Sequence, residues 1–309
     1  MTSQQKGGSG LAVFLEIANP GAVLLCALFP ALYGLVMVAE TSVHMNWYLS
    51  LVLVLVPCLL NVSINLFNDY YDYVKGNDRA DTVTDISEAP ILKYGLTDVR
   101  PILWAGWGCL LTTAVLGLTV IRMCHPMAIA IWAVGAVTVL AYSGKGVSLS
   151  HLPVGELVAG GVLGLLIPLG VYSACTGKIG WVEVYRCLPF FFNVAHIMLL
   201  NNTCDIEKDQ AAGRKTLPIL LGRERAKTLY RVMLILWLLV TLHITVVWHT
   251  FGALIYLILM VCLRKVIAGS LKLERVQSTK TADMGSVALI GLAIGFCMPA
   301  MGLIQLIFR

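Results

Sequence analysis

Charged residues are scarce in this sequence. Asp, Glu, Lys and Arg make up 13% of the 309 residues, about half the share of a typical soluble domain. Long polar segments are also lacking, because no stretch between apolar runs is long enough to fold as a separate domain. Apolar residues make up 58%, and the mean hydropathy is +0.83. These features exclude a soluble enzyme and predict an all-α integral membrane protein.

The sequence also lacks cysteine pairs at metal-binding or redox spacing. Its nine cysteines lie almost entirely within apolar runs, and none belongs to a Cys-x-x-Cys pair. We interpret them as small hydrophobic residues in reducing surroundings. Tandem repeats and low-complexity segments are absent as well. The net charge of +5 is modest, so we expect no nucleic-acid partner.

Nine apolar segments have about the 20 residues needed to cross a bilayer. Residues 1–10 (MTSQQKGGSG) are expected to be a disordered lead without a cleavable signal peptide. Residues 11–309 are expected to form one transmembrane domain, in which Trp248-His249 is the weakest separation between two spans. The expected spans lie near residues 11–39, 46–68, 99–121, 125–143, 152–175, 181–203, 226–247, 249–268 and 284–308.

Lys and Arg are distributed unevenly between the two sides of these spans. With the N-terminus in the cytoplasm, nine spans place all but four of the 22 Lys and Arg on the cytoplasmic side. The loops on the other side are short and carry little charge. The cytoplasmic loops hold the Asp-rich stretches, so we expect a site that opens to the cytoplasm. The four exceptions are Arg122, Lys178, Arg186 and Arg309.

A polar stripe ends the second apolar segment. At about 100° per residue, Asn61, Asn65, Asn68 and Asp72 fall on one helical face, and Asp69 lies at its edge. Carboxylates at a membrane are costly unless they are paired or bind a cation. This stripe therefore predicts a site for cations. Further charged residues follow it, namely Lys75, Asp78, Arg79, Asp81 and Asp85.

A second stripe, Asn202, Asp205 and Asp209, ends the sixth apolar segment. Carboxylate oxygens suit Mg²⁺, which completes its shell with water and phosphate oxygens. One acidic loop alone would usually be a solvated surface, but two matching stripes favour a shared site for Mg²⁺ and a diphosphate. Nearby cations would hold the remaining phosphate oxygens: Lys75, Arg79, Lys93, Arg214 and Lys215.

Three stretches carry a resemblance to a known family. They are NLFNDYYDYVKG at residues 65–76, YSGKG at 142–146 and NNTCDIEKD at 201–209. Their order and spacing are similar to the UbiA superfamily of intramembrane prenyltransferases, with its two Asp-rich motifs and short Tyr-containing loop. The forms NDYYDYVKGND and NNTCDIEKDQAAGRKTLPILLG most resemble the MenA branch, which prenylates 1,4-dihydroxy-2-naphthoate. Asn19-Pro20 departs from the family, where an Arg-Pro pair is frequent.

The resemblance implies a nine-helix bundle that transfers a polyprenyl group from an allylic diphosphate to an aromatic acceptor. It implies a Mg²⁺ cofactor, a prenyl tail that extends into the lipid bilayer, and a place in a bacterial or archaeal cell membrane. The residues that the resemblance implies for catalysis are Asp69, Asp72, Asp205, Asp209, Tyr142 and Lys145. Metal binding would fall to Asn68, Asn202 and the same four Asp. Substrate binding would fall to Asn65, Asn68, Lys75, Arg79, Lys93, Asn202, Arg214 and Lys215.

Several interpretations stay open at this point. Lys145 could hold the acceptor's carboxylate or the diphosphate, while Tyr142 orients or deprotonates the acceptor. The acceptor could instead be 4-hydroxybenzoate, homogentisate, a tetrapyrrole or a glycerol phosphate. A cation-coupled transporter is the rival from another class, although transporters place such groups near the membrane midplane. Glu16 is expected at an interfacial helix end, Glu156 is expected to snorkel, and the Gly-rich stretch near residue 160 to serve helix packing.

Overall fold

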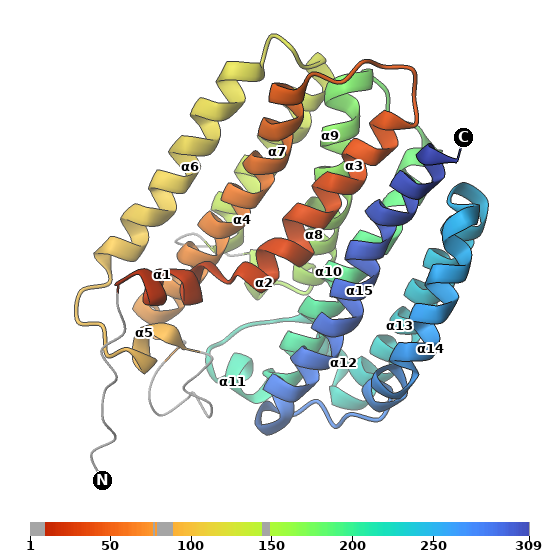
Figure 1. Ribbon diagram of the computed structural model, residues 1–309. Coiled ribbons are helices and arrows are strands. Elements are labelled where there is room, and N and C mark those ends of the chain that lie inside the picture. The colour runs from red at the N-terminus through yellow and green to blue at the C-terminus, as the bar shows by residue number, and fades with distance from the viewer. Residues whose placement is uncertain (1–9, 77, 79–88, 144–148, 309) are drawn as a thin grey trace.

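Helices make up all the regular structure in the described part of the chain (Figure 1). The computed structural model describes residues 10–76, 78, 89–143 and 149–308. Arg79, Lys145 and the predicted lead up to residue 9 lie outside these residues. Eight helical stretches are long and apolar enough to cross a membrane, and the shorter Pro126–Tyr142 is also apolar. The predicted all-α membrane class is confirmed.

The helical stretches follow the predicted segments closely. The long ones, in chain order, are α1 (Gly10–Ala18) with α2 (Pro20–Val23), η1 (Leu24–Leu28) and α3 (Phe29–Ala39); α4 (Trp47–Val74); α6 (Arg100–Val120); α7 (Pro126–Ser143); α8 (Gly155–Ala159) with η4 (Gly160–Leu166) and α9 (Ile167–Thr176); α10 (Trp181–Cys204); α13 (Arg223–Trp248); η5 (Thr250–Gly252) with α14 (Ala253–Ser270); and η6 (Gln277–Thr279) with α15 (Lys280–Ile307). The short ones are α5 (Pro90–Lys93), η3 (Leu149–His151), α11 (Ile206–Ala211) and α12 (Leu217–Leu221).

Two boundaries differ from the prediction for physical reasons. The first segment breaks at Asn19, whose φ of 50° is left-handed and whose side chain accepts a hydrogen bond from the Ala22 N–H. Residues Gly10–Ala18 (α1) and Pro20–Val23 (α2) therefore form separate helices. The second segment continues to Val74, so that the first Asp motif is helical. Gly76 follows the C-cap residue Lys75, and its φ of 75° suits a residue without a Cβ.

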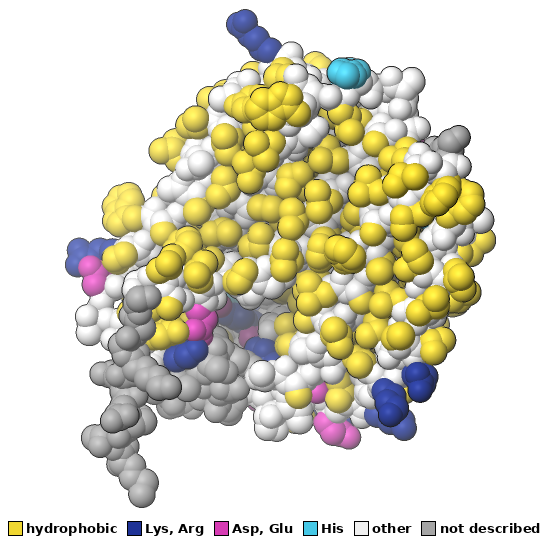
Figure 2. All heavy atoms as spheres, viewed as in Figure 1, with side chains coloured by type: hydrophobic (Ala, Val, Ile, Leu, Met, Phe, Trp, Pro, Cys, Tyr) yellow, Lys and Arg dark blue, Asp and Glu magenta, His cyan; other side chains and the backbone are white. Residues whose placement is uncertain are grey.

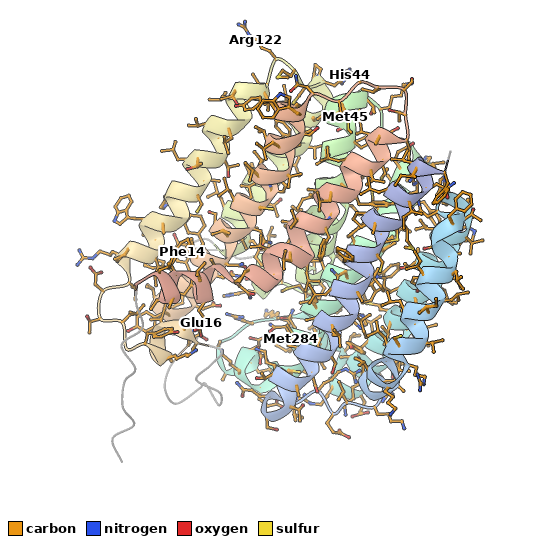
Figure 3. The ribbon with its side chains drawn as sticks, viewed as in Figure 1. Phe14, Glu16, His44, Met45, Arg122 and Met284 are labelled. Carbon is orange, nitrogen blue, oxygen red and sulfur yellow. The ribbon has the colours of Figure 1, made fainter. Side chains whose placement is uncertain are left out.

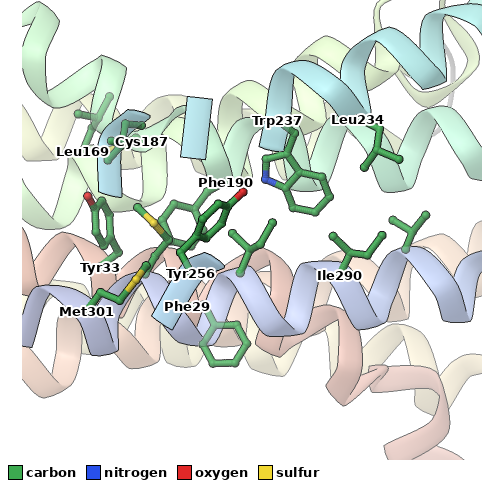
Figure 4. Packing of buried hydrophobic residues seen from close by; sticks show 14 of the residues in the cluster. Phe29, Tyr33, Leu169, Cys187, Phe190, Leu234, Trp237, Tyr256, Ile290 and Met301 are labelled. Atoms are coloured by element: carbon green, nitrogen blue, oxygen red, sulfur yellow. The ribbon is translucent and has the colours of Figure 1, made fainter. Parts of the chain in front are cut away.

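In the described part of the chain, the helices pack side by side around four clusters of buried apolar residues, one of them much larger than the others. Helix α4 packs against α6 and α7, α3 against α9 and α15, and α10 against η4 and α13. Figure 4 shows the largest cluster, in which Tyr33, Phe190 and Trp237 are fully enclosed. These apolar contacts hold the helices that carry both Asp motifs in fixed positions.

The Gly-rich stretch allows η4 to approach α10 closely. A Cβ added to Gly164 would lie 2.5 Å from the backbone of Phe190 and Phe191, and one on Gly160 would lie 3.0 Å from the Ala195 side chain. Any larger residue would therefore force the two helices apart. The predicted packing role of this stretch is confirmed.

Apolar side chains cover most of the surface, and charged ones gather toward the two ends (Figure 2). Leu111 and Leu118 on α6 and Leu254 on α14 are each more than half exposed. Such a surface suits lipid contact. The end that holds α5, α11 and α12 (Figure 1) also holds the Asp motifs.

The opposite end carries a buried ion pair that the sequence did not lead us to expect. Arg186 near the start of α10 lies 2.6 Å from Glu40 at the end of α3, and both side chains are less than one-tenth exposed. The guanidinium lies over the rings of Tyr33 and Trp248. His249 lies 3.7 Å from the same carboxylate. Arg186 therefore neutralises a carboxylate inside the protein and is not a loop cation facing solvent.

The positive-inside argument gives a topology that labelling can test. Asp98, Ala212 and Lys178 are all exposed in loops or at helix ends. In a cysteine-free background, Asp98→Cys and Ala212→Cys should react with a membrane-impermeant maleimide only from the cytoplasmic side. Lys178→Cys should react only from the other side. Labelling of positions 98 and 212 from opposite sides would contradict both the predicted topology and a shared site for the two motifs.

Candidate functional site

A cavity of about 550 Å³ lies toward the C-terminal ends of α4 and α10. Its polar wall is the stripe predicted on α4, formed by Asn61, Asn65, Asn68 and Asp69, and its deeper wall is aliphatic. Figure 2 shows a hollow on this face, and Figure 3 places Glu16 of α1 and Met284 of α15 on either side of it. The cavity therefore joins a polar end to an apolar interior.

The first motif is held in place by α1. The Asn65 side-chain amide donates to the Ala18 carbonyl at 2.9 Å and to Asn61 Oδ1 at 3.4 Å. These bonds satisfy the carbonyl at the α1 break and aim the Asn stripe into the cavity. Asn65 thus has a positioning contact in addition to its place in the cavity wall.

Arg214 joins the two Asp motifs. Its guanidinium lies 2.6 Å from Asp72 Oδ1 at the end of α4 and 3.2 Å from Asp209 Oδ1 in α11. Arg214 and Asp209 are largely buried, and Asp72 is partly exposed. The predicted convergence of Asp72, Asp209 and Arg214 is therefore present in the structure.

Asp205 is paired with a residue that the sequence analysis missed. Helix α10 ends at Cys204, and Asp205 forms the corner before α11. Its Oδ2 accepts a hydrogen bond from Lys280 Nζ at 2.6 Å, at the start of α15. Lys280 was counted only as one of many cytoplasmic cations. Because α15 is distant in sequence, no local pattern pointed to this pair.

Asn201, and not Asn202, lines the cavity. The Asn202 side chain is buried and donates to Glu156 Oε1 of α8 at 2.8 Å. Glu156 is 4% exposed, so the expectation that it snorkels to the surface is wrong. Asn202 thus stabilises the buried carboxyl group of Glu156, whereas Asn201 lines the cavity.

The cations near the site differ in their ion-pair partners and in their exposure. Lys93 Nζ lies 2.6 Å from Glu16 Oε1, and Tyr94 donates to the other oxygen of Glu16. Lys208 pairs with Asp78 at 2.7 Å. Lys75 and Lys215 are exposed. Glu16 was expected at an interfacial helix end; it also forms part of the cavity mouth.

Tyr142 is buried in the cavity wall, where its hydroxyl lies 3.9 Å from the sulfur of Met198. Its predicted partner Lys145 and the predicted phosphate ligand Arg79 lie outside the described residues. The structure therefore brings Tyr142 to the same cavity as the first Asp motif.

Burial and charge both act on groups at this end. Burial raises the pKa of Asp209 to about 6, although the nearby Arg214 opposes the shift. Burial, followed by the positive charges of Arg214 and Lys75, lowers the pKa of His151. Burial thus disfavours the charged form of both groups, so a cation that reaches Asp209 would stabilise its carboxylate.

The donor set fits a metal ion that shares its ligands with substrate. Among the described residues, no group of three or more His, Cys, Asp or Glu forms a ready metal site. Mg²⁺ commonly takes one or two carboxylates and fills its shell with water and phosphate oxygens. Asp205 Oδ1 and Asp209 Oδ2 are buried without a hydrogen-bond partner in the described structure. Such oxygens are costly unless a cation or donor reaches them.

Sequence comparison matches residues 27–300 to the UbiA prenyltransferase family. The 1,4-dihydroxy-2-naphthoate octaprenyltransferase of Bacillus subtilis is 30% identical over 230 residues, which cover 74% of this chain and 71% of that protein. The protein of the same name from Mycobacterium tuberculosis is 26% identical over 190 residues, covering 61% and 63%.

Solved structures share the fold at low sequence identity. A UbiA homolog from Archaeoglobus fulgidus bound to GPP and Mg²⁺ aligns with a TM-score of 0.61 and 16% identity, covering 93% of this chain and 99% of that one. A UbiA homolog from Aeropyrum pernix aligns with a TM-score of 0.62 and 15% identity, covering 91% and 96%. With a family match across most of its length, the chain belongs to the UbiA prenyltransferase family and is an integral membrane prenyltransferase.

Proposed function

We propose that this enzyme transfers a polyprenyl group from an allylic diphosphate to 1,4-dihydroxy-2-naphthoate, using Mg²⁺ and releasing the acceptor's carboxylate as CO₂. The bridge from Asp72 through Arg214 to Asp209 carries the proposal, because it joins the two Asp motifs next to a cavity that Asn68 and Asp69 line. The names of the relatives from two bacteria support this choice of acceptor.

The diphosphate would bind at the polar end. Asp69, Asp72, Asp205 and Asp209, with the amide oxygen of Asn68, are the proposed ligands of Mg²⁺. Asn202, which the sequence also predicted as a ligand, is buried against Glu156 and does not line the cavity. When bound, the metal supplies positive charge that stabilises the leaving diphosphate. Arg214 can donate to phosphate oxygens in a bidentate manner. The other proposed diphosphate ligands are Lys75, Arg79, Lys93 and Lys215.

The reaction requires a site that separates charge and excludes water. The allylic carbon–oxygen bond breaks, and its electron pair leaves on the diphosphate. The electron-rich ring supplies the pair for the new carbon–carbon bond, and loss of CO₂ returns a pair to the ring. The aliphatic deeper wall of the cavity, which includes Val162 and Leu163, would keep water from the allylic cation.

The acceptor would lie beside Tyr142. The Tyr142 hydroxyl is in the cavity wall and can hydrogen-bond a ring hydroxyl. Asn65 and Asn201 supply further amide groups on facing helices. Lys145, three residues after Tyr142 in the sequence, remains a proposed ligand for an anionic group.

The carboxylate roles can be tested by charge removal. Asp72→Asn, Asp205→Asn and Asp209→Asn should each lower kcat by about 100-fold or more, since each removes charge from a group that acts as a unit. Pyrophosphate release in detergent measures this loss. Asp98→Asn, in an exposed loop, is the control and should retain activity. Near-normal turnover of both Asp72→Asn and Asp205→Asn would contradict the proposed roles.

Lys280→Met tests whether Lys280 is the internal counter-ion of Asp205. The substitution leaves a buried carboxylate unpaired, which should lower stability by about 3–5 kcal/mol. Added Mg²⁺ should then raise the melting temperature more than in the parent protein, because the metal becomes the main counter-ion. Lys265→Met, on the exposed face of α14, is the control. An unchanged melting temperature and an unchanged Mg²⁺ response in Lys280→Met would contradict this role.

The acceptor can be identified from the products. With geranylgeranyl diphosphate, Mg²⁺ and 1,4-dihydroxy-2-naphthoate, the purified protein should form a prenylated naphthalenediol that lacks the carboxylate. Mass spectrometry detects the product, and released CO₂ should equal released pyrophosphate. Removal of Mg²⁺ with EDTA should stop the reaction, and added Mg²⁺ should restore it. Faster prenylation of 4-hydroxybenzoate or homogentisate would overturn the proposed acceptor.

A further inference from the structure

The connection between α14 and α15 passes beside the second Asp motif. It runs over residues 271–279, and Lys280 follows it as the first residue of α15. Figure 1 shows this connection at the end of the bundle that holds α11 and α12. Because Lys280 donates to Asp205 at 2.6 Å, the path of the connection fixes a cation beside the Asp205 carboxylate.

Arg275 lies within this connection in an unusual backbone conformation. Its φ of 55° falls in the left-handed region, which residues with a Cβ adopt rarely and which persists only where other contacts enforce it. The side chain supplies such contacts, because it is fully buried and donates to the carbonyls of Ser270 at 2.6 Å and Leu273 at 2.8 Å. Its guanidinium also lies 3.7 Å from the ring centroid of Tyr230 on α13.

Arg223 joins the connection to α10. It is the first residue of α13, where the helix dipole disfavours a cation, and its contacts lie outside its own helix. The guanidinium donates to the Thr203 carbonyl of α10 at 2.9 Å and also to the Arg275 carbonyl. Its other terminal nitrogen lies 2.6 Å from the Glu207 carboxylate of α11. One side chain therefore contacts α10, α11 and the connection that precedes α15.

The contacts of Arg223 lie on both sides of Asp205 in the chain. Thr203 comes before Asp205 and Glu207 comes after it, and the Asp205 residue is only 6% exposed. Its Oδ1 atom is buried without a hydrogen-bond partner among the described residues, whereas Oδ2 meets Lys280. Because one oxygen is engaged and the other is open, the orientation of this corner determines whether Oδ1 can bind a metal ion.

We propose that Arg223 and Arg275 are positioning residues for the second Asp motif. They hold the segment before α15 against the corner of α10 and α11, so that Asp205 keeps Oδ1 available to Mg²⁺. This inference rests on the proposed function, in which Asp205 is a metal ligand. Both arginines donate to main-chain carbonyls and neither lines the cavity, so they act through the segments that they join. Loss of either side chain would leave buried carbonyls unpaired and release the connection.

Metal binding tests this role without turnover. Mn²⁺ prefers the same oxygen ligands as Mg²⁺, and its EPR signal reports the free ion, so its affinity can be measured with inorganic pyrophosphate present. Arg223→Met and Arg275→Met should each weaken Mn²⁺ binding by about 10-fold or more, the usual cost of losing a group that orients a metal ligand. Parent-like affinity in both folded variants would overturn the inference. Absence of Mn²⁺ binding by the parent protein would instead contradict the proposed function.

Arg231→Met is the matched control for general destabilisation. Arg231 also lies on α13, and its Nε atom donates to the Leu271 carbonyl at 2.9 Å, at the end of the connection farther from Lys280. The same chemical change therefore removes a contact with the same connection. It should leave Mn²⁺ affinity within about twofold of the parent value, since effects at separate sites do not couple. An equal loss of affinity in Arg231→Met would overturn the specific role of the other two arginines.

Arg223→Lys separates geometry from charge. Lysine keeps the positive charge but lacks the planar fork with which Arg223 reaches two carbonyls and a carboxylate. Mn²⁺ binding should therefore remain weakened in Arg223→Lys, although less than in Arg223→Met. Full recovery of affinity in Arg223→Lys would overturn the positioning role and leave an effect of charge alone.

A second measurement uses the unmodified protein, so the inference stays testable if the arginine variants do not fold. Hydrogen exchange is compared with and without Mg²⁺ and pyrophosphate. Residues 203–209 and 271–284 should gain protection together, because the two arginines couple the connection to the motif. The connection between α9 and α10, at the opposite end, is the control and should not change. Protection of 203–209 without protection of 271–284 would overturn the inference, whereas protection of neither would contradict the proposed function.

Discussion

The structure depends on neutralising carboxylates that sit at the edge of a membrane. A buried, unpaired carboxylate is too costly to maintain, and this chain provides internal cations from distant segments. Arg214 lies between Asp72 and Asp209, and Lys280 pairs with Asp205. Together these contacts connect the end of α4, the α10–α11 corner and the start of α15. The charged groups that we propose to act in catalysis therefore also join the helices that form the site.

These internal cations also bear on substrate binding. A Mg²⁺ ion and a diphosphate that enter together bring both signs of charge, so Arg214 could exchange a carboxylate partner for a phosphate partner without remaining unpaired. Lys280 is placed differently, because it contacts the Oδ2 atom of Asp205 and leaves Oδ1 available. Arg214 is thus placed to pair with the diphosphate, whereas Lys280 orients the carboxylate of Asp205.

The rest of the bundle forms a gradient from polar to apolar along α4. Asn68 and Asp69 face the cavity near the C-terminal end of α4, Asn61 marks the transition, and Leu53 lies in apolar surroundings. Close packing keeps this arrangement rigid, as at Gly164, where no side chain would fit. At the opposite end, Arg186 and Glu40 fasten α10 to α3. The two ends of α10 are therefore both held by buried ion pairs.

The sequence by itself determined the helical membrane class, the approximate spans and the two Asp motifs. Hydrophobicity and the helical period are local properties, so the shared face of Asn61, Asn65 and Asn68 followed from spacing alone. Only the tertiary structure decided which partner each polar group meets. It directed Asn201 into the cavity and Asn202 toward Glu156, and it paired Lys93 with Glu16 and Asp205 with Lys280. These pairs join distant segments, and their geometry depends on how the helices rotate and pack, which spacing along one helix does not specify.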